Sequence, residues 1–157
     1  MSKVALSDVI IELHTPDFEI VKDFYGKLGF VKVWEYPPKG QSGYLVMRRE
    51  RSILAFFCGN EEVYNHSFFQ RFPKTTPRGY GVEICLYISD QPIERYYQHV
   101  LNVIGNASIV TPLETKPWGS KDFRMLDPFG FYVCVREQNN ILHRIESGTN
   151  KPFRFCR

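Results

Sequence analysis

One arrangement of strand and helix patterns occurs twice along this chain of 157 residues. An alternating strand pattern at residues 4–14 is followed by an amphipathic helix pattern and then by three short strand patterns. A second alternating strand at residues 82–89 opens the same order of elements. The glycines expected to end the two helices, Gly29 and Gly105, lie 76 residues apart. We therefore expect an α+β fold of two tandem βαβββ units.

Each expected helix has a capping signal at its start and an apolar stripe along its length. Thr15 is expected to cap the first helix, with Pro16 at its first position. Asp90 is expected to cap the second helix, with Pro92 in its first turn. The stripes comprise Phe18, Val21, Phe24, Tyr25 and Leu28 in the first helix, and Ile93, Tyr96, Tyr97, Val100, Leu101 and Ile104 in the second. Their helical spacing predicts that each helix packs on a sheet.

Three short strands are expected after each helix. In the first unit, at residues 4–58, they span residues 30–36, 44–49 and 52–58. In the second unit, at residues 80–137, they span residues 108–112, 122–126 and 131–136. Asp127, Pro128 and Gly130 favour a tight turn before the last of these strands.

Charge and apolar content limit what such a chain can do. With 43% hydrophobic residues the chain can build a core without disulfides, and no stretch reaches the ~20 apolar residues of a membrane span. The formal net charge of +3 resides in a basic C-terminal extension at residues 138–157, whereas residues 1–137 are balanced. We therefore expect a single domain at residues 1–137 without a nucleic-acid-binding face. No signal peptide is visible, so we expect a soluble, cytoplasmic protein.

The connection between the two units, residues 59–79, is long and aromatic. Loops of more than ~12–15 residues are usually functional or mobile. Because this loop carries four aromatic side chains, we expect it to pack against the sheet or a partner subunit, with a short helix through residues 63–69. The four cysteines form no CxxC pair and are expected to be reduced structural thiols.

Three stretches match motifs of one known superfamily. They are the helix and its end at residues 17–30, the strand sequence LAFF at residues 54–57, and the sequences PWG at residues 117–119 and DPFG at residues 127–130. Together they resemble the glyoxalase/bleomycin resistance/dioxygenase (vicinal oxygen chelate) superfamily, and most specifically its bleomycin-resistance-type members. The resemblance covers about residues 4–137. It implies that the two units form one cupped mixed β-sheet with helices on its outer face, around a cleft for a small molecule.

The same resemblance bears on metal binding. Enzymatic members of the superfamily hold a divalent metal ion with side chains from strands one, four, five and eight. In this chain those positions read Ile10, Ala55, Glu83 and Cys134. Isoleucine and alanine cannot bind a metal, and such a site needs three or four His, Glu or Gln ligands. We therefore expect no metal and no other cofactor in the usual position.

The side chains expected to bind a ligand combine aromatic rings with charges. They are Glu83, Trp118, Tyr87, Phe57, Tyr132, Phe123, Glu12 and Arg136, with Tyr36 as a further wall residue. Glu83 is expected either to anchor a cationic or hydrogen-bonding group, or to act as a general base, or to pair with Arg136 or another arginine of the sheet. Trp118 is expected either to stack on a planar ligand or to close the end of the sheet. The aromatic set favours flat, largely apolar ligands.

The sequence therefore predicts a homodimeric small-molecule-binding protein that sequesters an aromatic or cationic compound in a metal-free cleft, as the resemblance to bleomycin-resistance proteins implies. Two alternatives stay open. One is a metal-dependent lyase, isomerase or dioxygenase whose ligands, such as Glu12, His14 and Glu83, are displaced from the usual positions. The other is an interaction module whose partner docks through the basic tail.

Overall fold

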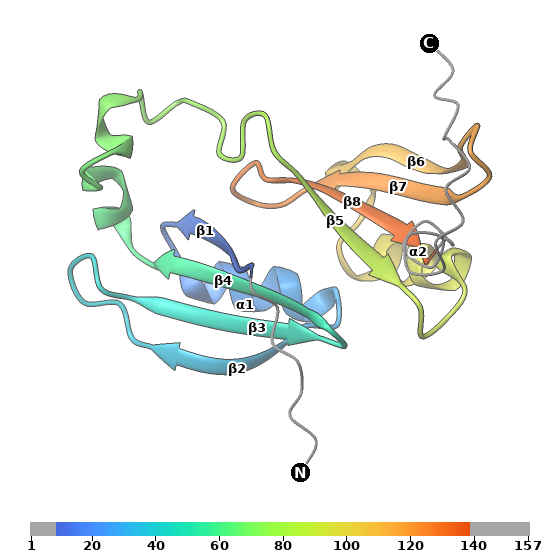
Figure 1. The fold of residues 1–157 in the computed structure, drawn as a ribbon, viewed down its shortest axis with the longest axis horizontal. Coiled ribbons are helices and arrows are strands. Elements are labelled where there is room, and N and C mark those ends of the chain that lie inside the picture. The colour runs from blue at the N-terminus through green and yellow to red at the C-terminus, as the bar shows by residue number, and fades with distance from the viewer. Residues whose placement is uncertain (1–8, 139–157) are drawn as a thin grey trace. The chain divides into compact units, whose positions relative to one another are not determined.

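The computed structural model describes residues 9–138, which fold into two compact units of the same construction. The first unit ends at Thr76 and the second begins at Pro77, inside the connection expected at residues 59–79. Each unit contains a strand, a helix and three further strands, in that order (Figure 1). The expected α+β class and the tandem βαβββ organisation are thereby confirmed. The joining of the two sheets into one cup stays an expectation.

The first unit is a four-stranded mixed sheet with one helix. Its elements are β1 (Ile11–Thr15), α1 (Phe18–Lys27), β2 (Val31–Tyr36), β3 (Tyr44–Arg49) and β4 (Ser52–Cys58). The strand order is β1-β4-β3-β2, in which β1 runs parallel to β4 and the other pairs are antiparallel. The strand expected at residues 4–14 thus extends to Thr15, and its first residues lie outside the described range.

The second unit repeats this construction. Its elements are β5 (Glu83–Ile88), α2 (Ile93–Val103), β6 (Ile109–Thr115), β7 (Lys121–Leu126) and β8 (Tyr132–Glu137). The strand order is β5-β8-β7-β6, again with one parallel pair, β5 and β8. Strand β6 continues three residues beyond Pro112, where we expected it to end. Because β6 is an edge strand, proline costs no ladder hydrogen bond on its outer side.

Strand alternation separates a helix-facing side of each sheet from an open face, which we define as the side turned away from that unit's helix. In the first unit the helix-facing side buries Leu13, Leu45, Met47, Leu54 and Phe56 against the stripe of α1. In the second unit it buries Ile84, Leu86, Ile88, Phe123, Met125, Val133 and Val135 against α2. Ring contacts of Tyr25 with Phe56 at 5.0 Å and of Tyr97 with Phe123 at 4.8 Å join helix to sheet in the two units. The functional side chains are therefore to be sought on the open faces.

Both helices begin two residues later than expected. Asp17, and not Thr15, caps α1: its Oδ1 accepts hydrogen bonds from the backbone amides of Glu19 at 2.8 Å and Ile20 at 3.1 Å. Thr15 remains in β1, paired with Cys58, because the residue before a proline is held out of helical conformation. The same rule applies before Pro92, which occupies the cap position of α2.

The connection after β4 contains two 3-10 helices, Glu61–Asn65 and Phe69–Arg71, in place of the single short helix expected through residues 63–69. Val63 of the first of these helices is buried. No helix among residues 9–138 has the length and apolar character that a membrane span requires. The expected basic extension lies outside the described residues, apart from Gln138.

Candidate functional site

The open face of the second sheet brings charged, thiol and aromatic side chains together. The pairing of β5 with β8, and of β8 with β7, fixes which side chains lie side by side. Glu83 lies beside Tyr132, Cys134 lies between Cys85 and Arg124, and Arg136 lies between Tyr87 and Asp122. Four residues that the sequence predicted for the site, namely Glu83, Tyr87, Tyr132 and Arg136, therefore share one surface.

A buried carboxylate organises the charges of this face. Asp122 is fully buried, and its Oδ1 accepts a hydrogen bond from Nη1 of Arg124 at 2.7 Å. Its Oδ2 accepts a longer one from Nε of Arg136 at 3.3 Å. Lys116 Nζ lies 3.5 Å from the same carboxylate. Asp122 thereby fixes both arginine side chains over the sheet.

Glu83 is paired with an arginine of the sheet, which was one of the three roles expected for it. The partner is Arg124, whose Nε donates to Glu83 Oε1 at 2.9 Å, and not Arg136. Because the charge of Glu83 is engaged in this pair, it is a poorer anchor for a cationic ligand than the sequence suggested. The pairing favours a role for Glu83 in holding Arg124 in place.

Two thiols lie close to these arginines. Cys85 is exposed and Cys134 is buried, and the two residues are direct partners across the parallel strands β5 and β8. A hydrogen bond from Cys134, followed by the positive charges of Arg136 and Arg124, lowers the pKa of Cys85 from 9.0 to about 7, against the opposing effects of burial and of Glu83. The same hydrogen bond, reinforced by burial, raises the pKa of Cys134.

The residues at the expected metal positions do not fit the divalent ion that the resemblance implies. Ile10, which lies just before β1, and Ala55 in β4 offer no donor atom. Glu83, Cys85 and Cys134 do place their ligand atoms within 4.8 Å of one another. However, Glu83 is already bonded to Arg124, and two guanidinium groups next to the thiols repel a cation.

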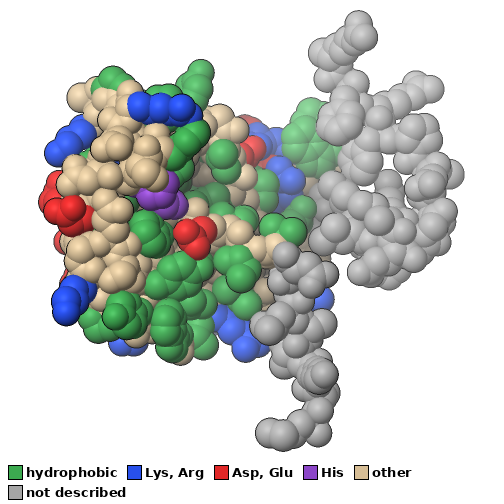
Figure 2. Space-filling model, turned by 60° about the vertical axis from the view of Figure 1, so that its left-hand side comes forward, with side chains coloured by type: hydrophobic (Ala, Val, Ile, Leu, Met, Phe, Trp, Pro, Cys, Tyr) green, Lys and Arg blue, Asp and Glu red, His purple; other side chains and the backbone are tan. Residues whose placement is uncertain are grey.

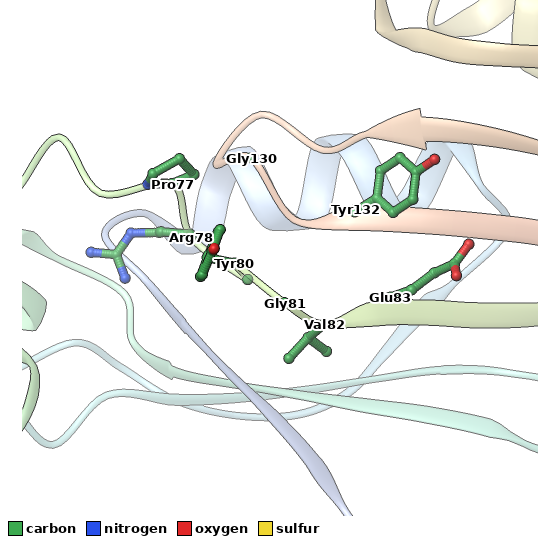
Figure 3. A pocket seen from close by; sticks show the side chains of 9 residues that line it. Pro77, Arg78, Tyr80, Gly81, Val82, Glu83, Gly130 and Tyr132 are labelled. Carbon is green, nitrogen blue, oxygen red and sulfur yellow. The ribbon is translucent and has the colours of Figure 1, made fainter.

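A pocket of about 310 Å³ lies at the start of β5 (Figure 3). It is lined by residues 77–83 together with Gly130 and Tyr132. In Figure 3 the carboxylate of Glu83 and the ring of Tyr132 project from neighbouring strands, while Val82 points to the opposite side from Glu83. The pocket therefore borders the pair of Glu83 and Tyr132 on the open face of the second sheet.

The open face of the first sheet is aromatic. One row across the strands holds Trp34, Val46, Ala55 and Glu12, and the next holds Tyr36, Tyr44, Phe57 and His14. The rings of Trp34 and Tyr36 are nearly parallel, with an angle of 22° and centroids 6.5 Å apart. Figure 2 shows hydrophobic side chains gathered beside a histidine and an acidic side chain. We call the side chains of these two rows the aromatic face.

The connection after β4 covers one end of the aromatic face. The His14 ring contacts Phe57 at 4.8 Å, His66 at 5.0 Å and Phe69 at 4.9 Å. The expectation that this segment packs against the sheet is therefore confirmed for His66 and Phe69, whereas Phe68 and Phe72 are exposed. Burial, and then a hydrogen bond to Glu12, raises the pKa of Tyr44, so Glu12 is tied to the same surface.

Two further predicted residues lie elsewhere. Trp118 is 42% exposed in the loop between β6 and β7, where Gly119 adopts a positive φ of 87°. Phe123 is completely buried, and its ring contacts Tyr97 of α2. Phe123 thus belongs to the core on the helix side of the sheet, and we leave it out of the candidate site.

Sequence reasoning missed Asp122, Arg124 and Trp34 as site residues. For the first two a signal existed, because the tight turn before β8 sets the pairing of β7 with β8 and so places Arg124 beside Cys134. For Trp34 the signal was alternation, because Trp34 and Tyr36 lie two residues apart in β2 and therefore point to the same face of the sheet.

Solved structures identify the fold. A bleomycin-binding protein complexed with bleomycin matches with a TM-score of 0.58 and 18% identity over 85% of this chain and 99% of that protein. A bleomycin resistance determinant encoded on the transposon Tn5 matches with a TM-score of 0.59 and 18% identity over 85% of this chain and 98% of its own. This chain has the glyoxalase/bleomycin resistance fold. A superfamily member from Sphaerobacter thermophilus agrees, with a TM-score of 0.58 and 19% identity over 84% of this chain and 98% of its own.

The expected superfamily fold is thereby confirmed. No protein-family model matches the chain, and no curated protein matches it in sequence. At identities of 18–19% the glyoxalase/bleomycin resistance fold is common to the matched proteins, whereas their ligands and activities are not thereby transferred to this chain.

Proposed function

We propose that this protein binds and sequesters a flat aromatic compound that carries a positive charge, without changing it chemically. The observation that carries the proposal is the aromatic face of the first sheet. Its outer side chains, Trp34 and Tyr36, are 54% and 47% exposed and lie nearly parallel. Large exposed aromatic groups that adjoin one another on a sheet are typical of a binding surface.

Stacking supplies the attraction. Covering apolar surface contributes about 25 cal/mol per Å², and aromatic pairs add about 0.5–1.5 kcal/mol beyond the area they bury. Tyr44, whose ring centroid lies 6.1 Å from that of Trp34, extends the surface toward Phe57. A molecule with fused rings can therefore contact several of these side chains at once.

Charge selects the ligand further. Glu12 and Trp34 stand at opposite ends of one row, with the short side chains of Val46 and Ala55 between them. Three strand spacings of about 4.8 Å separate the two ends, which suits a molecule of two or three fused rings. A cationic group at one end of such a molecule can meet the exposed carboxylate of Glu12, while its rings lie against Trp34.

The comparisons support a binding role. One solved structure of this fold is a bleomycin-binding protein complexed with bleomycin, so the fold accommodates a small-molecule ligand. The absence of donor atoms at Ile10 and Ala55 also favours binding over the metal chemistry of the enzymatic members. We further propose that the protein is a homodimer, in which exposed Phe68 and Phe72 are available for contact with a second copy.

A thermal-shift experiment with matched dyes tests the proposal. Acridine orange is flat and cationic, and fluorescein is flat and anionic. A ligand that binds only the folded state raises stability by about 2.7 kcal/mol at a free concentration about 100 times its dissociation constant. We expect acridine orange to raise the melting temperature and fluorescein to leave it unchanged.

Two variants locate the binding surface. Tyr36→Ala should lose most of the shift caused by acridine orange. Tyr80→Ala, which removes an exposed ring of the second unit, should retain it. Equal losses in the two variants, or no shift with any cationic dye, would contradict the proposal.

A metal-dependent enzyme is the second candidate, because Glu83, Cys85 and Cys134 bring three donor atoms together. The guanidinium groups of Arg124 and Arg136 oppose it, so we rank it lower. Elemental analysis of protein purified without chelators separates the two candidates. About one metal ion per chain, lost in Glu83→Ala, would favour the enzyme.

A further inference from the structure

We propose that Cys85 and Cys134 form a peroxide-responsive redox pair, in which Cys85 reacts first and Cys134 then closes a disulfide between β5 and β8. Both residues belong to the open face of the second sheet. The proposal is independent of ligand binding on the aromatic face, which belongs to the first unit.

The backbone geometry permits this disulfide. Cys85 and Cys134 are direct partners on neighbouring parallel strands, which lie about 4.8 Å apart. This spacing falls within the range of about 4.4–6.8 Å between Cα atoms that a disulfide spans. The two sulfur atoms already lie within 4.8 Å of each other on the same face. Rotation of the side chains can therefore bring them into bonding distance without a shift of either strand.

The surrounding charges favour a thiolate at Cys85. The groups that face it are Glu83 and Tyr87 of β5, Tyr132 and Arg136 of β8, and Arg124 and Asp122 of β7. Both carboxylates are bonded to the arginines, since Glu83 pairs with Arg124 and Asp122 with Arg124 and Arg136. Hydrogen bonding from Cys134 and the two arginine charges then lower the pKa of Cys85 to about 7. Thiolate, and not thiol, is the nucleophile toward a peroxide.

Exposure sets the order of events. Cys85 is accessible to a small oxidant, whereas Cys134 is completely buried and has a raised pKa. Cys134 therefore stays protonated as the hydrogen-bond donor until Cys85 is oxidised. Low pKa, accessibility and a neighbouring second thiol are the attributes of redox-sensor cysteines. The remaining described cysteine, Cys58, is buried and donates a hydrogen bond to Asn60 Oδ1 at 3.2 Å.

The reaction balances in two steps. The thiolate of Cys85 attacks one oxygen of hydrogen peroxide, the O–O bond breaks, and a sulfenic acid and a hydroxide ion form; the hydroxide takes a proton and leaves as water. The sulfur of Cys134 then attacks the sulfenic sulfur, an S–S bond replaces the S–O bond, and the departing hydroxide leaves as a second water with the proton of Cys134. Two thiols lose two electrons, and one peroxide is reduced to two waters.

Mass spectrometry of the full chain tests the pair. Reduced protein is treated with a small excess of hydrogen peroxide, digested without reductant and compared with untreated protein. We expect a linked peptide that contains Cys85 and Cys134 and has lost two hydrogens, while Cys58 stays reduced as an internal control. Oxidation of Cys58 at the same rate, or no linked peptide, would overturn the proposal.

Single variants resolve the two steps. In Cys134→Ser the sulfenic acid has no partner, so a dimedone adduct should accumulate at Cys85. In Cys85→Ser neither the adduct nor the disulfide should form. Iodoacetamide labelling of the wild-type protein gives a readout that does not depend on the folding of the variants: Cys85 should be modified at least about tenfold faster than Cys58. Equal labelling, or protection of both thiols by a co-purified metal ion, would contradict the proposal.

Discussion

Arg124 on β7 donates a hydrogen bond to Glu83 on β5, at 2.9 Å, across the intervening strand β8. The same guanidinium group bonds the buried Asp122. Arg124 therefore occupies the carboxylate of Glu83, which the sequence analysis expected as a ligand anchor. It also keeps a positive charge close to the two thiols. This arrangement distinguishes the second open face, which is charged and internally paired, from the aromatic face of the first unit.

Removal of the charge of Asp122 should destabilise the protein more than removal of the charge of Glu83. Asp122→Asn leaves Arg124 and Arg136 beside a neutral side chain in a buried position, and we expect a loss of about 3 kcal/mol. Glu83 is partly exposed, so Glu83→Gln should cost less than about 1 kcal/mol. Urea unfolding measures both changes, and equal losses would show that Asp122 does not organise the charges of this face.

The alkylation rate of Cys85 should depend on pH with a midpoint near 7. The lowered pKa means that the thiolate is present above about pH 7 and is lost as the pH falls through that value. Arg136→Gln removes one of the charges that lower the pKa and should move the midpoint upward. Iodoacetamide kinetics from pH 5 to about pH 10 measure the midpoint. A midpoint near the ordinary value of 9.0 in the wild-type protein would contradict the proposed electrostatics.

The start of α1 should depend on Asp17 and not on Thr15. Asp17→Ala removes the acceptor for the amides of Glu19 and Ile20 and should cost about 1 kcal/mol. Thr15 is buried, and its Oγ1 has no hydrogen-bond partner among the described residues, so Thr15→Val should change stability by less than about 0.5 kcal/mol or increase it. Thermal denaturation compares the stability of the two variants. A larger loss for Thr15→Val than for Asp17→Ala would indicate that Thr15 caps the helix, as the sequence suggested.

Phe123 should behave as a core residue. Phe123→Ala empties a completely buried position against Tyr97 of α2 and should cost about 3–5 kcal/mol. Tyr132, half-buried on the open face, is the matched control, and Tyr132→Ala should cost clearly less. Chemical denaturation measures the loss of stability in both variants. A small loss for Phe123→Ala would contradict its place in the core.

Local patterns predicted the elements of this fold well. The apolar stripe of α1 is buried at every position named from the sequence, and β3 and β4 have the expected bounds. Alternation along β5 and β8 correctly placed Glu83, Tyr87, Tyr132 and Arg136 on one face. These features depend on residues close together in the chain, which a sequence pattern records.

Features that depend on pairing between strands were missed. Phe123 was assigned to the cleft because the register of β7 against β8 was not used, and a shift of one residue moves a side chain to the other face. Both helix starts were placed too early because the effect of Pro16 and Pro92 on the residue before each was not weighed. The low pKa of Cys85 depends on arginines from two other strands and leaves no local signal.

Tryptophan fluorescence tests the central claim most directly. The chain has two tryptophans, so Trp118→Phe leaves Trp34 as the sole reporter on the aromatic face. Titration with acridine orange should quench its emission in a saturable manner, while fluorescein at equal concentration should cause no saturable quenching. Emission of Trp34 that does not respond to cationic aromatic compounds, or that responds equally to anionic ones, would contradict the account.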